Sequence, residues 1–341
     1  MRLSFEQFDL QLRHVFRIAR GASTVDPVVI VRLEHDGVVG LGEAAPSRRY
    51  GESIDTVGKF LKAIDASRFE DPFQVESILS SVDAMAPGNR AAKASVDIAL
   101  HDWVGKRLGV PLYRLWGLDA RKTPKTSFTI GIDTPEVVER KVREAEEYSI
   151  LKVKLGGEND EEMMKVIRRA TKKTLRVDAN EGWKTRETAV EKIKWLEQEG
   201  VEFVEQPMPA SDLAGTAWVR ERVNLPLIAD ENCLRLADIP PLRGAFDGIN
   251  IKLMKCTGVR EAVAMIQTAR ACGLKAMAGC MIETSVGISA AAQFSPMLDY
   301  ADLDGNLLIS NDPFEGVLVQ EGRLVLPDRP GLGVRPRSSS D

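Results

Sequence analysis

The chain has 341 residues, of which 44% are hydrophobic and 28% are charged, and its formal net charge at pH 7 is -4. This composition is ordinary for a globular protein of two domains, or of one large barrel with an additional module. Because the charges form no basic stripe and no apolar run reaches membrane-spanning length, we expect neither a nucleic-acid partner nor a membrane partner. The start of the chain resembles neither a signal peptide nor a transit peptide, and the four cysteines form no CxxC pair, so we expect reduced thiols in the cytoplasm.

The first third of the chain has the pattern of an α+β module, which we place at residues 1–120. Two strand-like runs flank Asp36-Gly37, a pair that favours a tight β-hairpin turn. Residues 89–109 have helical periodicity, and Gly109 indicates the end of that helix.

From about residue 124, short apolar runs alternate with charged helical stretches. In chain order, the runs are TSFTIGI, ILKVKLGG, LRVDANEG, VEFVEQP, LPLIADE, GINIKLMK and LKAMAGC. Alternating strands and helices indicate a parallel sheet, and so many units in succession favour a closed barrel. We therefore predict an α/β fold with a barrel at residues 121–305.

The last part of the chain, residues 306–341, is expected to return to the N-terminal module instead of extending the barrel. It contains a second hairpin signal at Glu321-Gly322. The tail from Arg329, RPGLGVRPRSSSD, is rich in glycine, proline and serine, which predicts partial disorder.

Three acidic residues stand at the ends of successive predicted strands: Asp178, Glu205 and Asp230. They follow one another at intervals of 27 and 25 residues, each about the length of a strand–helix unit, and Lys252 follows 22 residues later. Because functional residues gather at the carboxyl ends of barrel strands, these side chains are predicted to converge. Three carboxylates without cysteine or histidine favour Mg²⁺ or Mn²⁺ as the bound ion. The alternative is that each acid caps the next helix.

The strand ILKVKLGG carries two lysines, Lys152 and Lys154, whose side chains point to the same face because they are two residues apart. Lys154 precedes the acidic series and Lys252 follows it, so these two amines are predicted to lie on opposite sides of the barrel mouth. A bound divalent cation lowers the pKa of a nearby amine toward useful basicity, which makes both lysines candidate proton carriers. Lys152 would lower the pKa of Lys154 or hold a substrate carbonyl. The alternative is a pair of solvated lysines on an edge strand.

The segments KVK, VDAN, VEQP, ADE and NIKLMK, in this order and at barrel spacing, resemble the enolase superfamily in its muconate-lactonizing-enzyme-like subgroup. The resemblance extends over nearly the whole chain. It implies a modified (β/α)7β barrel of TIM type with an α+β capping domain. It also implies Mg²⁺ with lysine bases, which remove a proton next to a carboxylate to give a metal-stabilised enolate.

Within the subgroup, the segment LDYADLDG indicates which class of substrate the protein accepts. Asp302 and Asp304 are predicted to lie on one face of the final strand, and a carboxylate pair there resembles the feature by which dipeptide epimerases hold the α-ammonium group. Thr129 and Cys280 occupy positions at which the family contacts the substrate backbone. Glu283 is predicted to orient a lysine or its own loop. The alternative for the acidic pair is an Asp-rich turn.

Two further segments, FRIARGASTVD and SRRYGES, resemble the mobile lid loops of the family. They make Arg17, Arg20, Arg48 and Arg49 available for an acidic substrate side chain, unless these arginines are simply solvated.

We therefore predict a metal-dependent dipeptide epimerase that transfers a proton at the α-carbon of the second residue, with L-Ala-D/L-Glu or a related dipeptide as substrate. Within the same subgroup, the alternatives are an N-acylamino acid racemase, an o-succinylbenzoate synthase and a muconate cycloisomerase. An alternative of another class is a catalytically silent binding protein. A homo-oligomer is compatible with the sequence, which leaves the oligomeric state open.

Overall fold

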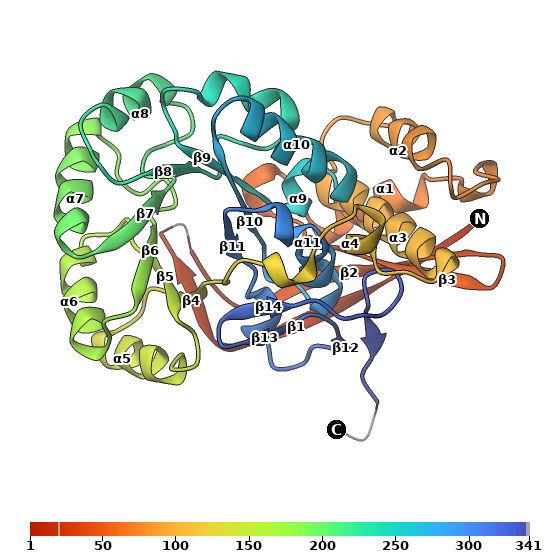
Figure 1. The fold of residues 1–341 in the computed structure, drawn as a ribbon, viewed down its shortest axis with the longest axis horizontal. Coiled ribbons are helices and arrows are strands. Elements are labelled where there is room, and N and C mark those ends of the chain that lie inside the picture. Colours follow the sequence, from red (N-terminus) through yellow and green to blue (C-terminus); the bar gives the residue numbers. More distant parts are fainter. Residues whose placement is uncertain (20, 339–341) are drawn as a thin grey trace.

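The computed structural model describes residues 1–19 and 21–338. Arg20, one of the predicted lid arginines, lies outside the described part of the chain, as do residues 339–341 of the tail. The chain forms a long N-terminal β-hairpin with helices, packed against a barrel (Figure 1). Among the described residues, no helix is both long and apolar enough to cross a membrane.

The N-terminal capping module is a three-stranded antiparallel sheet with helices packed on it. Its elements are β1 (Arg2–Ile18), β2 (Gly21–His35), β3 (Val38–Ala44), α1 (Ile54–Lys62), α2 (Val75–Ala84), α3 (Arg90–Leu108) and α4 (Leu112–Leu115). At the β2–β3 turn, Asp36 and Gly37 have positive φ angles of 47° and 73°, as the hairpin signal predicts. Helix α3 lies so close to β3 that a Cβ atom on Gly42 would come within 1.9 Å of the carbonyl oxygen of Ser95, so this position requires glycine.

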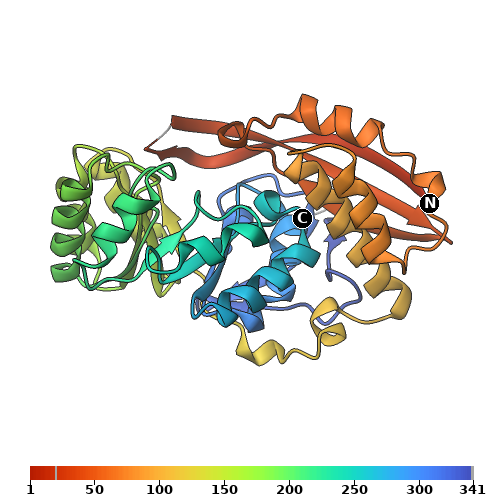
Figure 2. The same ribbon diagram turned by 90° about the horizontal axis from the view of Figure 1, so that it is seen from above.

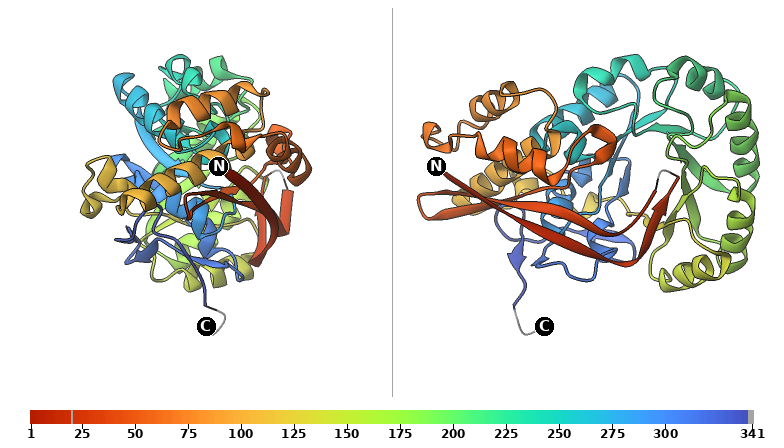
Figure 3. Two further views of the ribbon diagram at one scale, coloured as in Figure 1. Left: turned by 90° about the vertical axis from the view of Figure 1, so that its right-hand side faces the viewer. Right: turned by 180° about the vertical axis from the view of Figure 1, so that it is seen from behind.

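Eight parallel strands form the barrel. They are β4 (Phe128–Ile130), β5 (Ile150–Lys154), β6 (Thr174–Asp178), β7 (Val201–Glu205), β8 (Leu227–Ala229), β9 (Gly248–Ile251), β10 (Lys275–Gly279) and β11 (Tyr300–Asp302), each paired with its neighbour in the sequence. The ring closes beside β4 and β11, where Thr126 and Ala301 form a parallel bridge and the backbone N–H of Ser127 donates to the Ala301 carbonyl over 3.1 Å. The predicted capped (β/α)7β barrel is confirmed (Figure 3).

Helices connect most of the strands on the outside of the barrel. They are α5 (Pro135–Glu144), α6 (Asp160–Ala170), α7 (Arg186–Gln198), α8 (Leu213–Arg220), α9 (Leu253–Cys256), α10 (Val259–Ala271) and α11 (Ser285–Gln293). The connection from β8 to β9 instead contains two 3-10 turns, η4 (Leu236–Asp238) and η5 (Pro240–Leu242). The consecutive prolines Pro240 and Pro241 explain this difference, because proline removes a backbone donor and disrupts a helix interior.

The C-terminal segment returns to helix α3 of the capping module. Strands β13 (Leu318–Gln320) and β14 (Arg323–Val325) form a hairpin, and β12 (Phe314–Glu315) pairs with β15 (Arg335–Pro336). The backbone N–H of Leu332 donates to the Asp102 carboxylate of α3 over 2.8 Å. The bounds of the three predicted domains stay a prediction, as does the disorder of the last residues.

Two buried carboxylates of the capping module cap helices of the barrel. Asp97 in α3 accepts the backbone N–H of Val259 over 2.6 Å at the start of α10, where the helix's own cap residue is Gly258 and has no side chain. Glu43 in β3 accepts the backbone N–H and the hydroxyl of Thr284 over 2.8 and 2.6 Å, just before α11. Because helix N-termini attract negative charge, these contacts fix the capping module over the barrel (Figure 2).

A second carboxyl group, that of Glu283, lies beside Glu43. Both side chains are buried, and a Cβ atom on Gly287 would come within 2.2 Å of Glu283 Oε2 and 3.2 Å of Glu43 Oε2. Burial, reinforced by the charge of Glu43, raises the pKa of Glu283 to about 8. Burial also raises the pKa of Glu43 to about 7. The pair therefore holds a proton near neutral pH.

Raising the pH is expected to weaken the fold through this pair. Because the folded-state pKa values lie above the ordinary 4.5, the folded protein keeps protons that the unfolded chain has released, and stability is lost as the pH rises to about 8. Glu283→Gln should reduce the loss of unfolding free energy between about pH 6 and about pH 9, by on the order of 2 kcal/mol. Urea unfolding at each pH measures this loss. The exposed control Glu70→Gln should behave as the wild type, and an unchanged pH dependence in Glu283→Gln would contradict the proton that the Glu43–Glu283 pair holds near neutral pH.

Candidate active site

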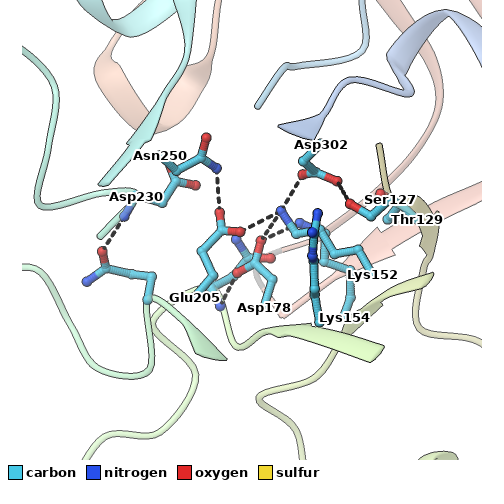
Figure 4. Close-up of polar contacts among 12 residues, drawn as sticks. Ser127, Thr129, Lys152, Lys154, Asp178, Glu205, Asp230, Asn250 and Asp302 are labelled. Carbon is cyan, nitrogen blue, oxygen red and sulfur yellow. Dashed lines mark hydrogen bonds and ion pairs between the residues drawn. The ribbon is translucent and has the colours of Figure 1, made fainter. Parts of the chain in front are cut away.

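The three predicted metal-binding acids meet at the barrel mouth. Asp178 and Glu205 are the last residues of β6 and β7 and are paired in register, and Asp230 directly follows β8. One carboxylate oxygen of each residue lies within 4.8 Å of the others, and all three side chains are buried. The structure thus brings together residues that the sequence places at successive strand ends (Figure 4).

Each of these carboxylates has one oxygen held by a donor of the fold. The held oxygens are Asp178 Oδ1, Glu205 Oε1 and Asp230 Oδ1. Their donors are the backbone N–H of Asn180, the side-chain amide of Asn250 and the ammonium of Lys255, over 2.9, 2.8 and 2.5 Å respectively. The second oxygen of each carboxylate is left to face lysines at the cavity.

Lys152 and Lys154 approach the first two acids from β5. Lys152 Nζ lies 3.1 Å from Asp178 Oδ2 and 2.8 Å from Glu205 Oε2. Lys154 Nζ lies 2.6 Å from Asp178 Oδ2. The two lysines therefore reach the same carboxylate, as expected for side chains on one face of a strand.

Lys252 stands at the other end of the acidic series, directly after β9. Its Nζ lies 2.8 Å from Asp230 Oδ2. Burial alone would lower the pKa of Lys252, but the carboxylates of Asp230 and Glu205 outweigh burial and raise it. The lowered pKa predicted for the lysines is an effect of a bound cation and stays a prediction.

The donor set fits a divalent cation. Glu205 Oε2 is buried and accepts no hydrogen bond from the described residues, although Lys152 lies near it as an ion pair. Burial, together with the negative charge of Asp178, raises the pKa of Glu205 to about 8, so negative charge is crowded at this point. Carboxylate oxygens without nitrogen or sulfur ligands suit Mg²⁺ or Mn²⁺, whose charge would relieve the crowding.

A cavity of about 1160 Å³ opens over the barrel mouth, beneath the capping module. The predicted site residues that line it are Thr129, Lys152, Lys154, Asp230, Lys252, Cys280, Asp302 and Asp304. Residues 21–27 and 45–50 of the capping module contribute to its wall, including two of the predicted lid arginines, Arg48 and Arg49. Arg49 donates two hydrogen bonds of 3.0 Å to Glu181, so its charge is already opposed.

Asp302 and Asp304 both line the cavity, but they differ in backbone position and in hydrogen-bond partners. Asp302 ends β11, where Oδ2 lies 2.6 Å from Lys152 Nζ and Oδ1 accepts the Ser127 hydroxyl over 2.6 Å. Asp304 lies beyond the strand because the chain turns there, so the prediction that both residues belong to the strand is wrong. Asp304 Oδ2 accepts the backbone N–H of Thr129 over 2.6 Å. Burial and the charge of Asp302 raise the pKa of Asp304 to about 6.

Sequence reasoning missed three polar residues of the site: Ser127, Asn250 and Lys255. Asn250 lies on β9, two residues before Lys252, which directly follows this strand in extended backbone, so the period of a strand could have found Asn250. Ser127 likewise lies two residues before Thr129. Lys255 belongs to the one-turn helix α9, and no periodicity in the sequence indicates that its side chain turns back to the site.

Two family descriptions match the chain. Residues 6–117 match the N-terminal domain of mandelate racemase / muconate lactonizing enzyme. Residues 136–340 match the enolase C-terminal domain-like family. The matched ranges correspond to the capping module and to the barrel with its C-terminal segment.

Three known proteins show how far the likeness extends. The chain is 54% identical to the L-Ala-D/L-Glu epimerase of Bacteroides thetaiotaomicron, over 98% of this chain and 88% of that protein. It superposes with a TM-score of 0.92 and 30% identity on the dipeptide epimerase of Cytophaga hutchinsonii complexed with Mg and the dipeptide D-Ala-L-Val, covering 99% and 96% of the two chains. It also superposes, with a TM-score of 0.91 and 29% identity, on the N-succinyl Arg/Lys racemase of Bacillus cereus, again covering 99% and 96%. The fold alone therefore does not separate a free from an acylated amino group.

Proposed function

The chain belongs to the enolase superfamily, in the mandelate racemase / muconate lactonizing enzyme family, and we propose that it is a metal-dependent epimerase of dipeptides, with L-Ala-D/L-Glu as the first candidate substrate. One observation carries this function: two lysines face one cavity from either side of three convergent carboxylates. The name of the relative from Bacteroides thetaiotaomicron supports the choice of substrate.

Lys154 and Lys252 are the proposed catalytic residues. They come from β5 and from the end of β9, with three strands of the barrel between them, and both line the cavity. One amine takes the proton from the α-carbon of the second residue, and the other ammonium delivers a proton to the opposite face. The configuration of that carbon is thereby inverted.

Asp178, Glu205 and Asp230 are the proposed ligands of Mg²⁺, with Mn²⁺ as the alternative ion. When bound, such a cation stabilises the negative charge that develops on the substrate carboxylate as the α-proton leaves. Lys152 is proposed to contribute fixed positive charge beside this position, since its ammonium lies within ion-pair distance of Asp178 and Glu205. Thr129 and Cys280 line the cavity and are proposed to contact the substrate backbone.

Asp302 and Asp304 are proposed to bind the α-ammonium group of the dipeptide. Both carboxylates are buried, and no described residue forms an ion pair with Asp304 within 4.0 Å. A buried carboxylate is stabilised by a charged partner, which a free ammonium supplies and an acylated amine does not. This contrast distinguishes a dipeptide epimerase from an N-acylamino acid racemase, an o-succinylbenzoate synthase or a muconate cycloisomerase. A catalytically silent binding protein would not require two lysines facing one cavity.

The two-base arrangement predicts a different defect for each lysine. Lys252→Ala should slow epimerisation in both directions by about 10²- to 10⁴-fold, because one of the two proton carriers is missing. The remaining Lys154 should still exchange the α-proton of one epimer with deuterium from solvent. Lys154→Ala should retain exchange of the other epimer only. NMR of deuterium incorporation into each epimer measures both effects.

Lys152→Ala is the matched control for the two catalytic lysines. It should slow both epimers alike, since it removes positive charge and leaves both proton carriers in place. Equal residual exchange of both epimers in Lys252→Ala would contradict the two-base arrangement.

The proposed ammonium site predicts that the free amino group is required. N-acetylation of an accepted dipeptide should reduce kcat/KM by at least about 100-fold, because two buried carboxylates would then face an uncharged amide. Polarimetry with the free and the acetylated dipeptide measures the ratio of the two kcat/KM values. Equal turnover of the two compounds would favour the acylamino acid racemase.

A further inference from the structure

Two polar side chains beneath the site touch the proposed metal ligands but do not line the cavity. Asn250 lies on β9 and Lys255 on the one-turn helix α9, with Lys252 between them in the sequence. Both are fully buried, at 0% exposure, whereas Lys252 lines the cavity. A substrate in the cavity therefore meets Lys252 but neither of its two polar neighbours.

The ammonium of Lys255 has all three of its hydrogens engaged by the fold. Lys255 Nζ donates to Asp230 Oδ1 over 2.5 Å, to the Asp230 carbonyl over 2.6 Å and to the Asn250 carbonyl over 3.0 Å. Since an ammonium has three donors, none is left for a substrate. The contact turns Asp230 so that Oδ2 is the oxygen that faces Lys252, which lies 2.8 Å from it.

Asn250 holds Glu205 in a similar way. Its side-chain amide donates to Glu205 Oε1 over 2.8 Å (Figure 4). A Cβ atom on Gly279 would come within 2.6 Å of Asn250 Oδ1, so the amide is packed closely against β10 and has little room to rotate. Glu205 Oε2 is thereby left as the oxygen that accepts no hydrogen bond from the described residues.

The two contacts produce the same arrangement in Glu205 and in Asp230. One carboxylate oxygen, on the inner side, accepts a hydrogen bond from Asn250 or Lys255, and the other oxygen faces a lysine at the cavity. Without the inner donor, a buried carboxylate can rotate and place both oxygens on the nearest lysine, which is Lys152 for Glu205 and Lys252 for Asp230. We propose that Asn250 and Lys255 are positioning residues that hold Glu205 and Asp230 in the orientation that binds the divalent cation. This inference rests on the proposed metal-dependent function.

The decisive measurement is Mg²⁺ binding by isothermal titration calorimetry without substrate. Asn250→Leu removes the donor to Glu205 without changing charge, and we expect its affinity for Mg²⁺ to fall by about 10- to 100-fold, as for other residues that orient metal ligands. Asn250→Ala gives the same readout if the leucine variant does not fold. An Asn250 variant that folds and binds Mg²⁺ as tightly as the wild type would overturn the role of Asn250.

Lys255→Met distinguishes a positioning role of Lys255 from simple neutralisation of Asp230, because the two roles predict different changes in Mg²⁺ affinity. If Lys255 only neutralises Asp230, removing its charge should leave Mg²⁺ affinity unchanged or increase it. If Lys255 positions Asp230, the affinity should fall by at least about 10-fold. An unchanged or increased affinity would overturn the role of Lys255, and Lys255→Gln repeats the test if the methionine variant does not fold.

Lys93→Met is the matched control, because Lys93 is a buried ammonium with three acceptors in the capping module. Its Nζ donates to the Asp83 carbonyl, the Asp83 carboxylate and the Ala86 carbonyl, over 2.9, 2.9 and 2.6 Å. This variant should lose thermal stability but keep wild-type Mg²⁺ affinity. A comparable loss of affinity in Lys93→Met would assign the effect to general destabilisation and overturn the inference. If the wild type binds no Mg²⁺, the proposed function fails first, before the variants are compared.

Discussion

Negative charge gathered on buried side chains is the constraint on which the rest of this structure depends. Five buried carboxyl groups of the proposed site lie at the barrel mouth, namely Asp178, Glu205, Asp230, Asp302 and Asp304, and the buried Glu231 lines the same cavity. Four buried lysines oppose them: Lys152, Lys154, Lys252 and Lys255. With every group charged, the acids outnumber the lysines, and a buried charge is tolerated only when it is paired. A divalent cation would offset this excess of negative charge.

Two features of the architecture gather the acidic side chains at the barrel mouth and shield them from solvent. Parallel strands bring Asp178 and Glu205 into register, which no single loop would do with the same accuracy. The capping module then closes over the cavity, and it is held there by carboxylates at two helix N-termini, Asp97 at α10 and Glu43 near α11. Acidic residues thus form the proposed cation site at the strand ends and also join the two parts of the fold. The acids at the strand ends face lysines or the proposed metal ion, whereas the acids that join the two modules accept hydrogen bonds from backbone N–H groups.

Much of the fold and of the site could be predicted because both depend on short periods in the sequence. The alternation of strands and helices gave the barrel, and the last polar residue of each strand gave Asp178, Glu205 and Asp230. The same period placed Lys152 on the face of Lys154, and the structure agrees.

The features that could not be predicted depend on contacts that follow no strand or helix periodicity in the sequence. Lys255 turns back to Asp230 from a one-turn helix, and only the packed structure reveals this direction. Asp304 lies past the end of β11, directly before the 3-10 turn at Gly305–Leu307, so a strand pattern misplaced it by extending the strand too far. The partner of Glu283 could not be predicted either, because Glu43 lies in another module and is remote in the sequence.

The acidic pair at the last strand also bears on which substrate the cavity accepts. Asp302 is already satisfied by Lys152 and by the Ser127 hydroxyl. Asp304 accepts the Thr129 backbone N–H and, at 3.9 Å, the Cys280 thiol, but no described lysine or arginine forms an ion pair with it, and its pKa is raised to about 6, so its charged form lacks a counter-charge in direct contact. A substrate ammonium placed beside Asp304 would supply that charge and lower the pKa of Asp304, whereas an acylated amine would leave the carboxyl group protonated or unpaired. The cost of burying Asp304 is therefore offset only when a cationic group binds, and this asymmetry favours a free amino terminus over an acylated one although the two classes of enzyme share the fold.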